Sequence, residues 1–520
     1  MPSSPVPRLL VTRWFLPLNA GVRFFLFVCA LLVAALVSPA AEAPKLNIVF
    51  ILADDLGIND LNCYGRAEHH TPNLDQLARD GMRFTASYCA QPICSPSRAA
   101  ILTGQAPARL HLTTYLPGRP DAPSQKLLHP KINQQLPLAH TTLAEALKTN
   151  GYITACIGKW HLGGKGFLPM DQGFDMYHPG NAVTKPSDTE GGKGEYDLTR
   201  AAMAFMETNR ARPFFLYLAH NSPHIPYSAN ANLVAKNAKA FEPVYAAVIE
   251  TLDDSIGLLL HKLEALGLRT NTIVIFTSDN GGLHVPEGLH QSTTDNSPFR
   301  AGKGFLYEGG LRVPLIVRWP NQVPAGRVVD WPVINTDWLP TLLLLTGARA
   351  PKDLDGQSFA SLLLTGIPGP GAIDAPKGRI TISQRVPLQS RTLFWHFPHY
   401  TNQGSRPGGA VREGDWKLIE HYDTGRAELY NLSTDPSETT DLAAKEQQRV
   451  SDLRDKLHRW RIDVGAQTNA LNPEFKPSLS KSLYVDTDAS RYEPVKSTAA
   501  THERMLAWRR QMNAVLPRVK

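Results

Sequence analysis

Four runs of consecutive hydrophobic residues recur along the chain, and each is followed by charged or polar residues. The runs span residues 46–52, 153–157, 214–218 and 272–276. Unbroken apolar runs of this length are typical of strands that are buried on both faces, as in a parallel sheet. Between them lie stretches with helical patterns, such as residues 71–82 and 140–151. This alternation of strand and helix predicts an α/β fold.

The pattern changes after residue 365. Residues 365–378 are rich in Pro and Gly, which predicts a linker or long loop. Two or three strands are expected within residues 391–432, followed by a helix over about residues 444–462. The helix is indicated by apolar residues at helical spacing, namely Val450, Leu453, Leu457 and Trp460. We therefore expect a small antiparallel sheet that packs against this helix.

These patterns divide the chain into four segments. They are a targeting segment at residues 1–40, an α/β domain at 45–365, a C-terminal α+β subdomain at 379–465, and an unassigned extension at 466–520. The extension has no clear pattern beyond a helical stretch from Thr501 to Val515.

The targeting segment has the order of a secretory signal. A basic region with Arg8, Arg13 and Arg23 precedes an apolar run at Phe24–Val37, and small residues follow up to Ala40. The alternative is a membrane anchor, but the run is shorter than the roughly 20 residues that a span needs. We expect cleavage after Ala40, export to the periplasm or the medium, and no stable membrane insertion once the signal is removed.

Charge and cysteine content narrow the classes of partner. The net charge is +7, and removal of the signal arginines leaves the chain mildly basic. It has no Lys/Arg block and no interleaving of aromatic and basic residues, so nucleic acid is not an expected partner. Five cysteines, one of them in the signal, are too few for a disulfide framework. We predict buried thiols at Cys63, Cys89 and Cys156; a Cys63–Cys89 or Cys89–Cys94 bridge is the alternative.

Polar residues at the ends of the predicted strands indicate one site. Ligands of α/β sheets bind beyond the carboxyl ends of the strands, where such residues meet. Asp54 and Asp55 end one strand, and Asp279 and Asn280 end another. A single Asp after a strand is more often a turn residue or a helix cap. Two such pairs favour a Ca²⁺ or Mg²⁺ site, because these ions prefer hard oxygen ligands.

Basic side chains accompany these oxygens. Lys159 and His161 follow one hydrophobic run, His224 follows another, and Lys303 lies further along the chain. A metal ion with lysines and histidines around it suits a tetrahedral oxyanion ester, because these groups stabilise its charge. From the residues alone, the expected chemistry is metal-assisted phosphoryl or sulfuryl transfer.

A cysteine motif narrows this further. Residues 94–104, CSPSRAAILTG, match the pattern Cys-x-Pro-Ser-Arg-x-x-x-Leu-Thr-Gly at every fixed position and so resemble the type I sulfatases. Other segments look like sulfatase segments in the same order, among them ADDLG, GYITACIGKWHLG, SPHIPY and TSDNGG. The resemblance covers about residues 45–462.

The resemblance implies an alkaline phosphatase-like fold, with a large mixed, mostly parallel sheet flanked by helices. It also implies that Cys94 is oxidised to formylglycine by a formylglycine-generating maturation enzyme. In the family a divalent cation, usually Ca²⁺ with Mg²⁺ possible, is bound at the positions of Asp54, Asp55, Cys94, Asp279 and Asn280.

The same resemblance assigns roles to the other residues. Arg98 would hold the formylglycine hydrate, whose hydroxyl attacks sulfur. Lys159 and Lys303 would bind sulfate oxygens. His224 would bind sulfate and, with Lys303, help to protonate the leaving oxygen, while His161 would assist the final release of sulfate.

The sequence therefore predicts an exported sulfatase that hydrolyses a sulfate ester. A sulfated polysaccharide or glycosaminoglycan fragment is the substrate that export and the resemblance imply. Two alternatives remain: a phosphonate or phosphodiester hydrolase of the same superfamily, whose ester would suit the same metal and nucleophile, and a non-catalytic, glycan-binding relative that kept the fold.

Overall fold

The computed structural model describes residues 45–287, 294–365, 371–374, 381–385 and 391–517. The predicted signal at residues 1–40 and the predicted subdomain boundary at residue 379 lie outside the described residues. Across the described part of the chain, no helix is both long and apolar enough to cross a membrane.

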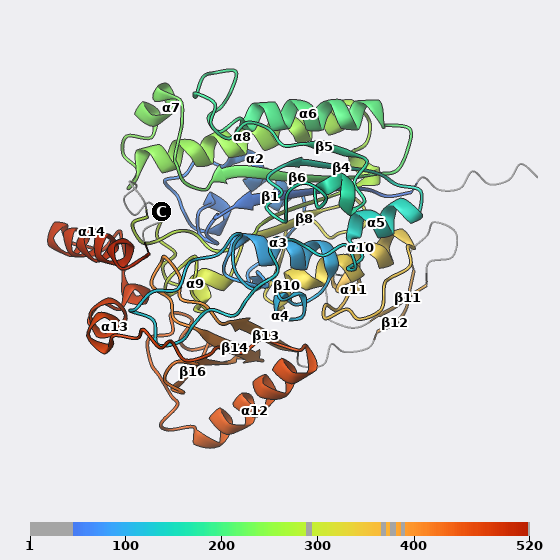
Figure 1. The fold of residues 1–520 in the computed structure, drawn as a ribbon. Coiled ribbons are helices and arrows are strands. Elements are labelled where there is room, and N and C mark those ends of the chain that lie inside the picture. The colour runs from blue at the N-terminus through green and yellow to red at the C-terminus, as the bar shows by residue number, and fades with distance from the viewer. Residues whose placement is uncertain (1–44, 288–293, 366–370, 375–380, 386–390, 518–520) are drawn as a thin grey trace, which may run out of the picture. The chain divides into compact units, whose positions relative to one another are not determined.

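An eight-stranded sheet, in the order β5–β4–β6–β1–β7–β8–β2–β9, carries most of the first part of the chain (Figure 1). Neighbours from β5 to β7 pair in parallel, as do β2 and β9, whereas β8 is antiparallel to β7 and β2. The strands are β1 (Asn47–Asp54), β2 (Met82–Phe84), β4 (Ile153–Gly158), β5 (Met176–His178), β6 (Phe214–Pro223), β7 (Thr272–Ser278), β8 (Leu315–Arg318) and β9 (Arg327–Val329). The predicted α/β class with a mixed, mostly parallel sheet is confirmed.

The four hydrophobic runs form β4, β6, β1 and β7, which are neighbours in the sheet. Every residue of β1 is buried, because successive side chains enter opposite helical layers. Phe50 belongs to the apolar cluster on one face, whereas Val49 and Ile51 belong to the cluster on the other. A strand that is covered on both faces needs apolar residues at every position, which explains the unbroken runs.

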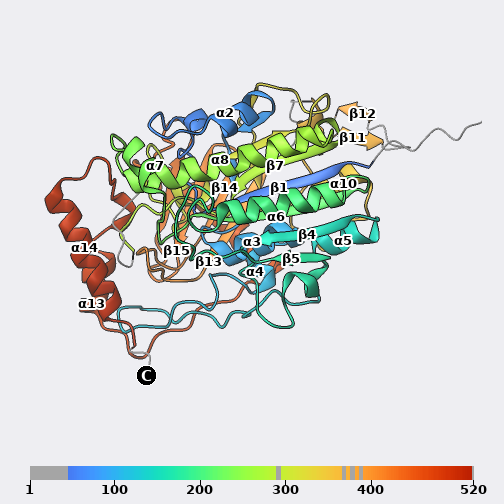
Figure 2. The same cartoon turned by 90° about the horizontal axis from the view of Figure 1, so that it is seen from above.

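Helices cover both faces of this sheet. Figures 1 and 2 show α6 (Glu195–Thr208) and α8 (Pro243–Ala265) side by side over one face, and α2 (Pro72–Arg79) packs in the same apolar cluster. The other face packs against α3 (Cys94–Thr103), α5 (Leu143–Thr149), α10 (Trp338–Thr346) and α11 (Ala360–Thr365). The predicted helices at residues 71–82 and 140–151 are present as α2 and α5.

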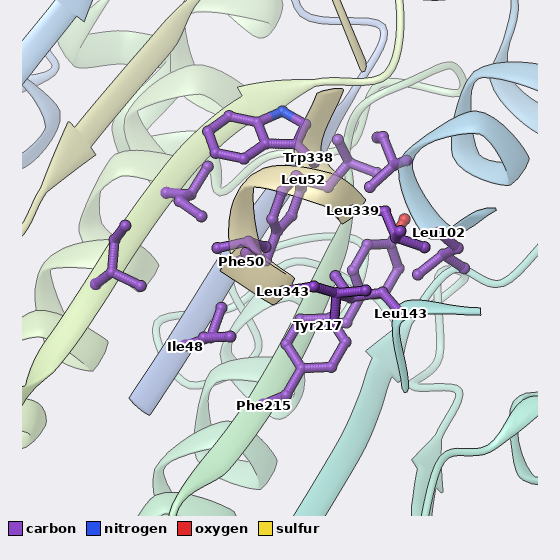
Figure 3. Close-up of a cluster of buried hydrophobic side chains, with 14 of the residues drawn as sticks. Ile48, Phe50, Leu52, Leu102, Leu143, Phe215, Tyr217, Trp338, Leu339 and Leu343 are labelled. Carbon is purple, nitrogen blue, oxygen red and sulfur yellow. The ribbon is translucent and has the colours of Figure 1, made fainter. Parts of the chain in front are cut away.

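Figure 3 shows the core on the second face, where strand side chains meet α10. The ring of Phe50 packs edge-on against Trp338, with centroids 5.4 Å apart, and is stacked with Tyr217 at 5.8 Å. Full burial of one such side chain contributes about 1.5–3 kcal/mol. The short elements around this core are β3 (Ser87–Tyr88), β10 (Val333–Ile334), α4 (Pro107–Leu110), α7 (Ala231–Lys236) and α9 (Glu308–Leu311).

A second, antiparallel sheet follows in the order β13–β14–β15–β16. Its strands are β13 (Thr392–Phe397), β14 (Gly408–Glu413), β15 (Trp416–His421) and β16 (Ala427–Asn431). The helix α12 (Gln447–Asp463) packs on it through Leu453 and Leu457, as predicted. The prediction of two or three strands was wrong in number. One expected strand is a hairpin, because Gly414 has a φ of +57° and allows a two-residue turn.

Two further predictions concern the C-terminal part, of which residues 366–370 and 375–380 lie outside the described residues. The linker predicted at residues 365–378 contains β11 (Gly371–Asp374), which pairs antiparallel with β12 (Thr381–Arg385). Its strand character depends on that partner more than on its own short sequence, Gly-Ala-Ile-Asp. The extension forms α13 (Pro477–Tyr484) and α14 (Ala499–Ala514), and α14 corresponds to the predicted helical stretch.

The four cysteines of the described residues are free thiols, so neither alternative disulfide is present. Cys89, Cys94 and Cys156 are buried. Cys63 is only partly buried, which corrects the prediction for that residue.

Candidate active site

The carboxyl ends of β1 and β7 bring the predicted oxygen-bearing residues together. Because the two strands pair in parallel, Asp54 at the end of β1 lies beside the residues that follow β7. Asp55 has a φ of +67°, and its backbone N–H donates to Asp279 Oδ1 at 3.1 Å. Asn280 Nδ2 donates to Asp55 Oδ1 at 2.8 Å. All four residues are buried.

Cys94 is the first residue of α3 and lies at a helix N-terminus, where negative charge is favoured. Its Sγ is 3.6 Å from Asp54 Oδ1 and 3.8 Å from Asp55 Oδ1. Burial raises the pKa of the Cys94 thiol well above its ordinary value, against the opposing charges of Lys159 and Lys303. A neutral thiol is a weak nucleophile, so the unmodified cysteine is poorly suited to attack an ester.

Arg98 lies one turn after Cys94, on the same face of α3. Its side chain is fully buried, and its Nε donates to Asp279 Oδ2 at 2.9 Å. Nη2 is 3.5 Å from Asp54 Oδ1, and Nη1 donates to the carbonyl oxygen of Lys159 at 2.8 Å. A buried charge is tolerated only when it is paired. Arg98 therefore fixes α3 against the ends of β1, β4 and β7.

Two lysines pair with the carboxylates of β1. Lys159 Nζ lies 2.6 Å from Asp54 Oδ2, and Lys303 Nζ lies 2.6 Å from Asp55 Oδ2. Burial alone would raise the pKa of Asp54, but Lys159 and the other cationic groups nearby outweigh it and hold this pKa well below its usual range. The carboxylate of Asp54 is therefore ionised at neutral pH.

Two histidines flank the cluster. His224 Nε2 lies 3.6 Å from Asp55 Oδ2, and its side chain is 29% exposed. His161 Nε2 lies 2.9 Å from the carbonyl oxygen of Leu116, and its Nδ1 is buried without a hydrogen-bond partner. Burial lowers the pKa of each imidazole to about 4. A neighbouring lysine adds to the shift, Lys303 for His224 and Lys159 for His161. Both rings are neutral at pH 7.

The donor set fits a hard divalent cation. Ligand atoms of Asp54, Asp55, Cys94 and His224 all lie within 4.8 Å of one another. The buried Oδ1 of Asn280 has no hydrogen-bond partner, which is costly for a polar atom unless a ligand engages it. Carboxylate and amide oxygens are the ligands that Ca²⁺ and Mg²⁺ prefer. His224, expected from the sequence to bind sulfate and to help protonate the leaving oxygen, also belongs to this cluster.

Three buried carboxylates of the site are each paired with a cation. The carboxylates are Asp54, Asp55 and Asp279, and the cations paired with them are Lys159, Lys303 and Arg98. A bound divalent cation would make the site electropositive and therefore suited to an anionic ester.

One cationic residue of the site was missed by the sequence analysis. Lys193 is buried, and its Nζ contacts the carbonyl oxygen of His224. The signal that could have revealed it is the glycine-rich stretch GGKG at residues 191–194, which precedes α6. Three glycines among four residues indicate backbone angles that residues with side chains rarely adopt.

Comparisons with known proteins agree with this geometry. Residues 46–348 match the family model described as sulfatase, and residues 301–463 match the one described as N-sulphoglucosamine sulphohydrolase, C-terminal. Human arylsulfatase A is 34% identical over 460 residues, which cover 79% of this chain and 86% of the relative. N-acetylgalactosamine-6-sulfatase of Rattus norvegicus is 36% identical, with 63% of this chain and 67% of the relative covered.

Solved structures agree as well. Ps i-CgsB, in complex with k-i-k-neocarrahexaose, superposes with a TM-score of 0.68 at 28% identity, covering 81% of this chain and 93% of that chain. The resemblance expected from the cysteine motif is thus confirmed over most of the chain. The chain belongs to the sulfatase family and is an arylsulfatase-like hydrolase of the alkaline phosphatase-like superfamily.

Proposed function

We propose that this sulfatase hydrolyses a sulfate ester of a sulfated polysaccharide or glycosaminoglycan fragment, and that Cys94 acts as formylglycine. The observation that carries the proposal is the position of Cys94. It lies at a helix N-terminus, within 4 Å of two carboxylates and inside a ring of buried cations, yet burial keeps its thiol neutral. Such a site offers the fixed charges that sulfuryl transfer needs, but the thiol is not a competent nucleophile.

Formylglycine supplies that nucleophile, because its hydrate offers one hydroxyl for attack on sulfur and a second for release of sulfate. A formylglycine-generating maturation enzyme is therefore an expected partner. Arg98 is held by Asp279 and by the Lys159 carbonyl, and so presents a fixed positive charge beside residue 94.

The divalent cation is proposed to be Ca²⁺, with Mg²⁺ as the alternative. Asp54, Asp55, Asp279, Asn280 and residue 94 would hold it. When bound, it would act as a Lewis acid that stabilises negative charge on the transferring group.

The remaining residues would bind and orient the ester. Lys159 pairs with Asp54 and Lys303 pairs with Asp55, so their ammonium groups can contact different sulfate oxygens. The imidazole of His224 is partly exposed and neutral, so it can donate one N–H bond to the ester without adding charge. His161, partly buried and neutral, can accept a proton during release of sulfate.

The substrate class is supported by the relatives. One is named N-acetylgalactosamine-6-sulfatase, and one similar structure contains k-i-k-neocarrahexaose. The signal-like residues 1–40 support export to the periplasm or the medium, where such polymers are met.

The test is mass spectrometry of the tryptic peptide Phe84–Arg98, from protein co-produced with a formylglycine-generating enzyme. An aldehyde at residue 94 is expected, together with turnover of sulfate esters in preference to phosphonate esters. An unmodified thiol in fully active protein would contradict the proposal. Preference for phosphonate esters would favour the phosphonate or phosphodiester hydrolase. If the protein binds glycans without turnover, and Cys94→Ala leaves that binding unchanged, the non-catalytic glycan-binding relative would be favoured.

A further inference from the structure

The segment of residues 191–195, Gly-Gly-Lys-Gly-Glu, has an unusual backbone. Four successive residues have positive φ: Gly191 at +60°, Gly192 at +62°, Lys193 at +53° and Gly194 at +71°. A Cβ at Gly192 would lie 2.1 Å from the carbonyl oxygen of Ser228, so glycine is required there. Lys193 is the exception in this run, and a left-handed conformation costs a residue with a side chain roughly 1–2 kcal/mol.

This segment contacts the last part of β6 and His224, which directly follows that strand. Asn221 Nδ2 donates to the carbonyl oxygen of Lys193 at 3.2 Å, and the Asn221 backbone N–H donates to Glu195 Oε1 at 3.1 Å. The other oxygen of Glu195 contacts His220 Nδ1. Lys193 Nζ contacts the carbonyl oxygen of His224 itself. The segment therefore holds the end of β6 at His220 and Asn221, and the residue after it at His224.

Lys193 combines two unfavourable features that the fold does not require. Its backbone is strained, and the residue is buried, with 3% of its surface exposed, although it carries a charge. A neutral donor would satisfy a carbonyl oxygen, and α6 already begins after Gly194. Strain and buried charge at one residue beside an active site indicate a functional constraint.

The neighbouring charges suggest what this constraint is. Lys193 interacts electrostatically with Asp54, Lys159 and Asp55 of the charged cluster and also with Glu195 of its own segment, so it lies at the edge of that cluster. His224 is the most exposed of the side chains around Asp55, and at 3.6 Å its Nε2 is the least tightly held. The ring of His224 is held at Nδ1, which lies 2.5 Å from the carbonyl oxygen of Ile225, whereas the Lys193 side chain holds the main chain of His224.

We propose that Lys193 is a positioning residue of the sulfatase site, which fixes the His224 imidazole for contact with the sulfate group by binding the His224 carbonyl oxygen. This rests on the proposed sulfate-binding role of His224. Glu195 and the Lys193 carbonyl oxygen hold the end of β6, and the Lys193 side chain sets the position of His224.

The test compares Lys193→Met, Lys193→Arg, His224→Ala and the Lys193→Met/His224→Ala double variant in the matured, metal-loaded enzyme, with 4-nitrophenyl sulfate as substrate. Lys193→Met should lower kcat/KM by about tenfold or more, whereas Lys193→Arg, which keeps the donor, should stay within about threefold. The double variant should be no slower than His224→Ala, because a residue that acts through another shows strong coupling. Lys185→Met, an exposed lysine ahead of the segment, is the matched control.

A second readout avoids turnover. In a Cys94→Ser background, binding of inorganic sulfate is measured by calorimetry, and Lys193→Met should weaken it only while His224 is present. Lys193→Gly removes the side chain and relieves the strained backbone, so it separates loss of the amine from misfolding. The inference would be overturned if Lys193→Met and Lys193→Gly both kept full activity. It would also be overturned if the loss caused by Lys193→Met multiplied with the loss caused by His224→Ala. Full activity of His224→Ala would instead contradict the proposed function of that histidine.

Discussion

At the scale of single residues, Cys94 and Cys89 show how surroundings decide chemistry. Both thiols are buried, and burial raises the pKa of both. Cys89 belongs to an apolar cluster, and its Sγ lies 3.4 Å from the carbonyl oxygen of Gly310. Cys94 lies among carboxylates and lysines at the start of a helix. The two residues are therefore a matched pair for testing which cysteine reacts.

We expect Cys94→Ser to lose turnover, because serine has one hydroxyl and cannot expel sulfate once it has been sulfated. Cys89→Ser should keep activity within about threefold, since serine can still donate to the Gly310 carbonyl oxygen. Steady-state assays on a sulfate ester, with mass spectrometry for a sulfated residue 94, decide the matter. Near-wild-type turnover by Cys94→Ser would remove the formylglycine mechanism.

Lys193 marks the limit of prediction at this scale. Asp54, Asp55, Asp279 and Asn280 could be found because each follows a hydrophobic strand, and strand ends of a parallel sheet converge. Lys193 follows no strand. It reaches the site only because its backbone has positive φ between glycines, and backbone angles are not written in a residue pattern.

At the scale of elements, the contact between α9 and β15 depends on a buried charged group. Lys417 Nζ of β15 lies 2.8 Å from Glu308 Oε1 of α9 and 2.9 Å from Glu438 Oε1, and all three side chains are fully buried. Two carboxylates thus share one ammonium group. Burial raises the pKa of Glu438 to about 7, with Lys417 opposing the shift and Glu308 adding to it. Lys417 and neighbouring arginines outweigh burial at Glu308 and lower its pKa.

These shifts predict a pH dependence of stability. Between the ordinary value of 4.5 and about 7, native Glu438 keeps a proton that the unfolded chain has lost, so the free energy of unfolding falls as pH rises through this window. The lowered pKa of Glu308 has the opposite effect and raises the free energy of unfolding as pH rises. This increase is complete above the ordinary pKa of 4.5, so it does not oppose the trend between pH 5 and pH 8. Glu438→Gln cannot ionise, so its stability relative to wild type should increase from pH 5 to pH 8, by on the order of 1–3 kcal/mol.

Denaturant unfolding at several pH values measures this difference. Glu503→Gln, on an exposed position of α14, is the control and should run parallel to wild type. The slope with pH is the relevant quantity, because the amide also loses one acceptor at every pH. Parallel curves for wild type and Glu438→Gln would show that Glu438 is ionised throughout.

The sequence predicts the strands of the first sheet better than those of the second sheet and of the β11–β12 pair. The strands β1, β4, β6 and β7 were found because burial on both faces leaves an unbroken apolar run. The hairpin of β14 and β15 was counted as one strand, since its turn is only Gly414-Asp415 and polar residues alternate on both sides. A strand such as β11 is defined by its partner, and a local pattern does not contain that partner.

At the scale of the whole molecule, residues from distant parts of the sequence build one cation site. Asp54, Cys94, His224 and Asn280 come from four segments that are separate in the unfolded chain. A cation that needs all of them binds the native state alone and stabilises it by mass action, about 3–4 kcal/mol at 100 to 1,000 times the dissociation constant. Each carboxylate of the site also has a cationic partner within the protein. The chain should therefore stay folded without metal.

We expect chelation to abolish activity and lower the unfolding temperature while the circular dichroism spectrum stays native, and Ca²⁺ or Mg²⁺ to restore both properties. Asp55→Asn should remove the response of the unfolding temperature to Ca²⁺, because it weakens the ligand set. Asp452→Asn, an exposed acid on α12, should respond like wild type. Full activity of demonstrably metal-free protein would exclude the carboxylate cluster as a cation site. Unfolding on chelation would show instead that the internal ion pairs do not suffice to hold β1, α3 and β7 together.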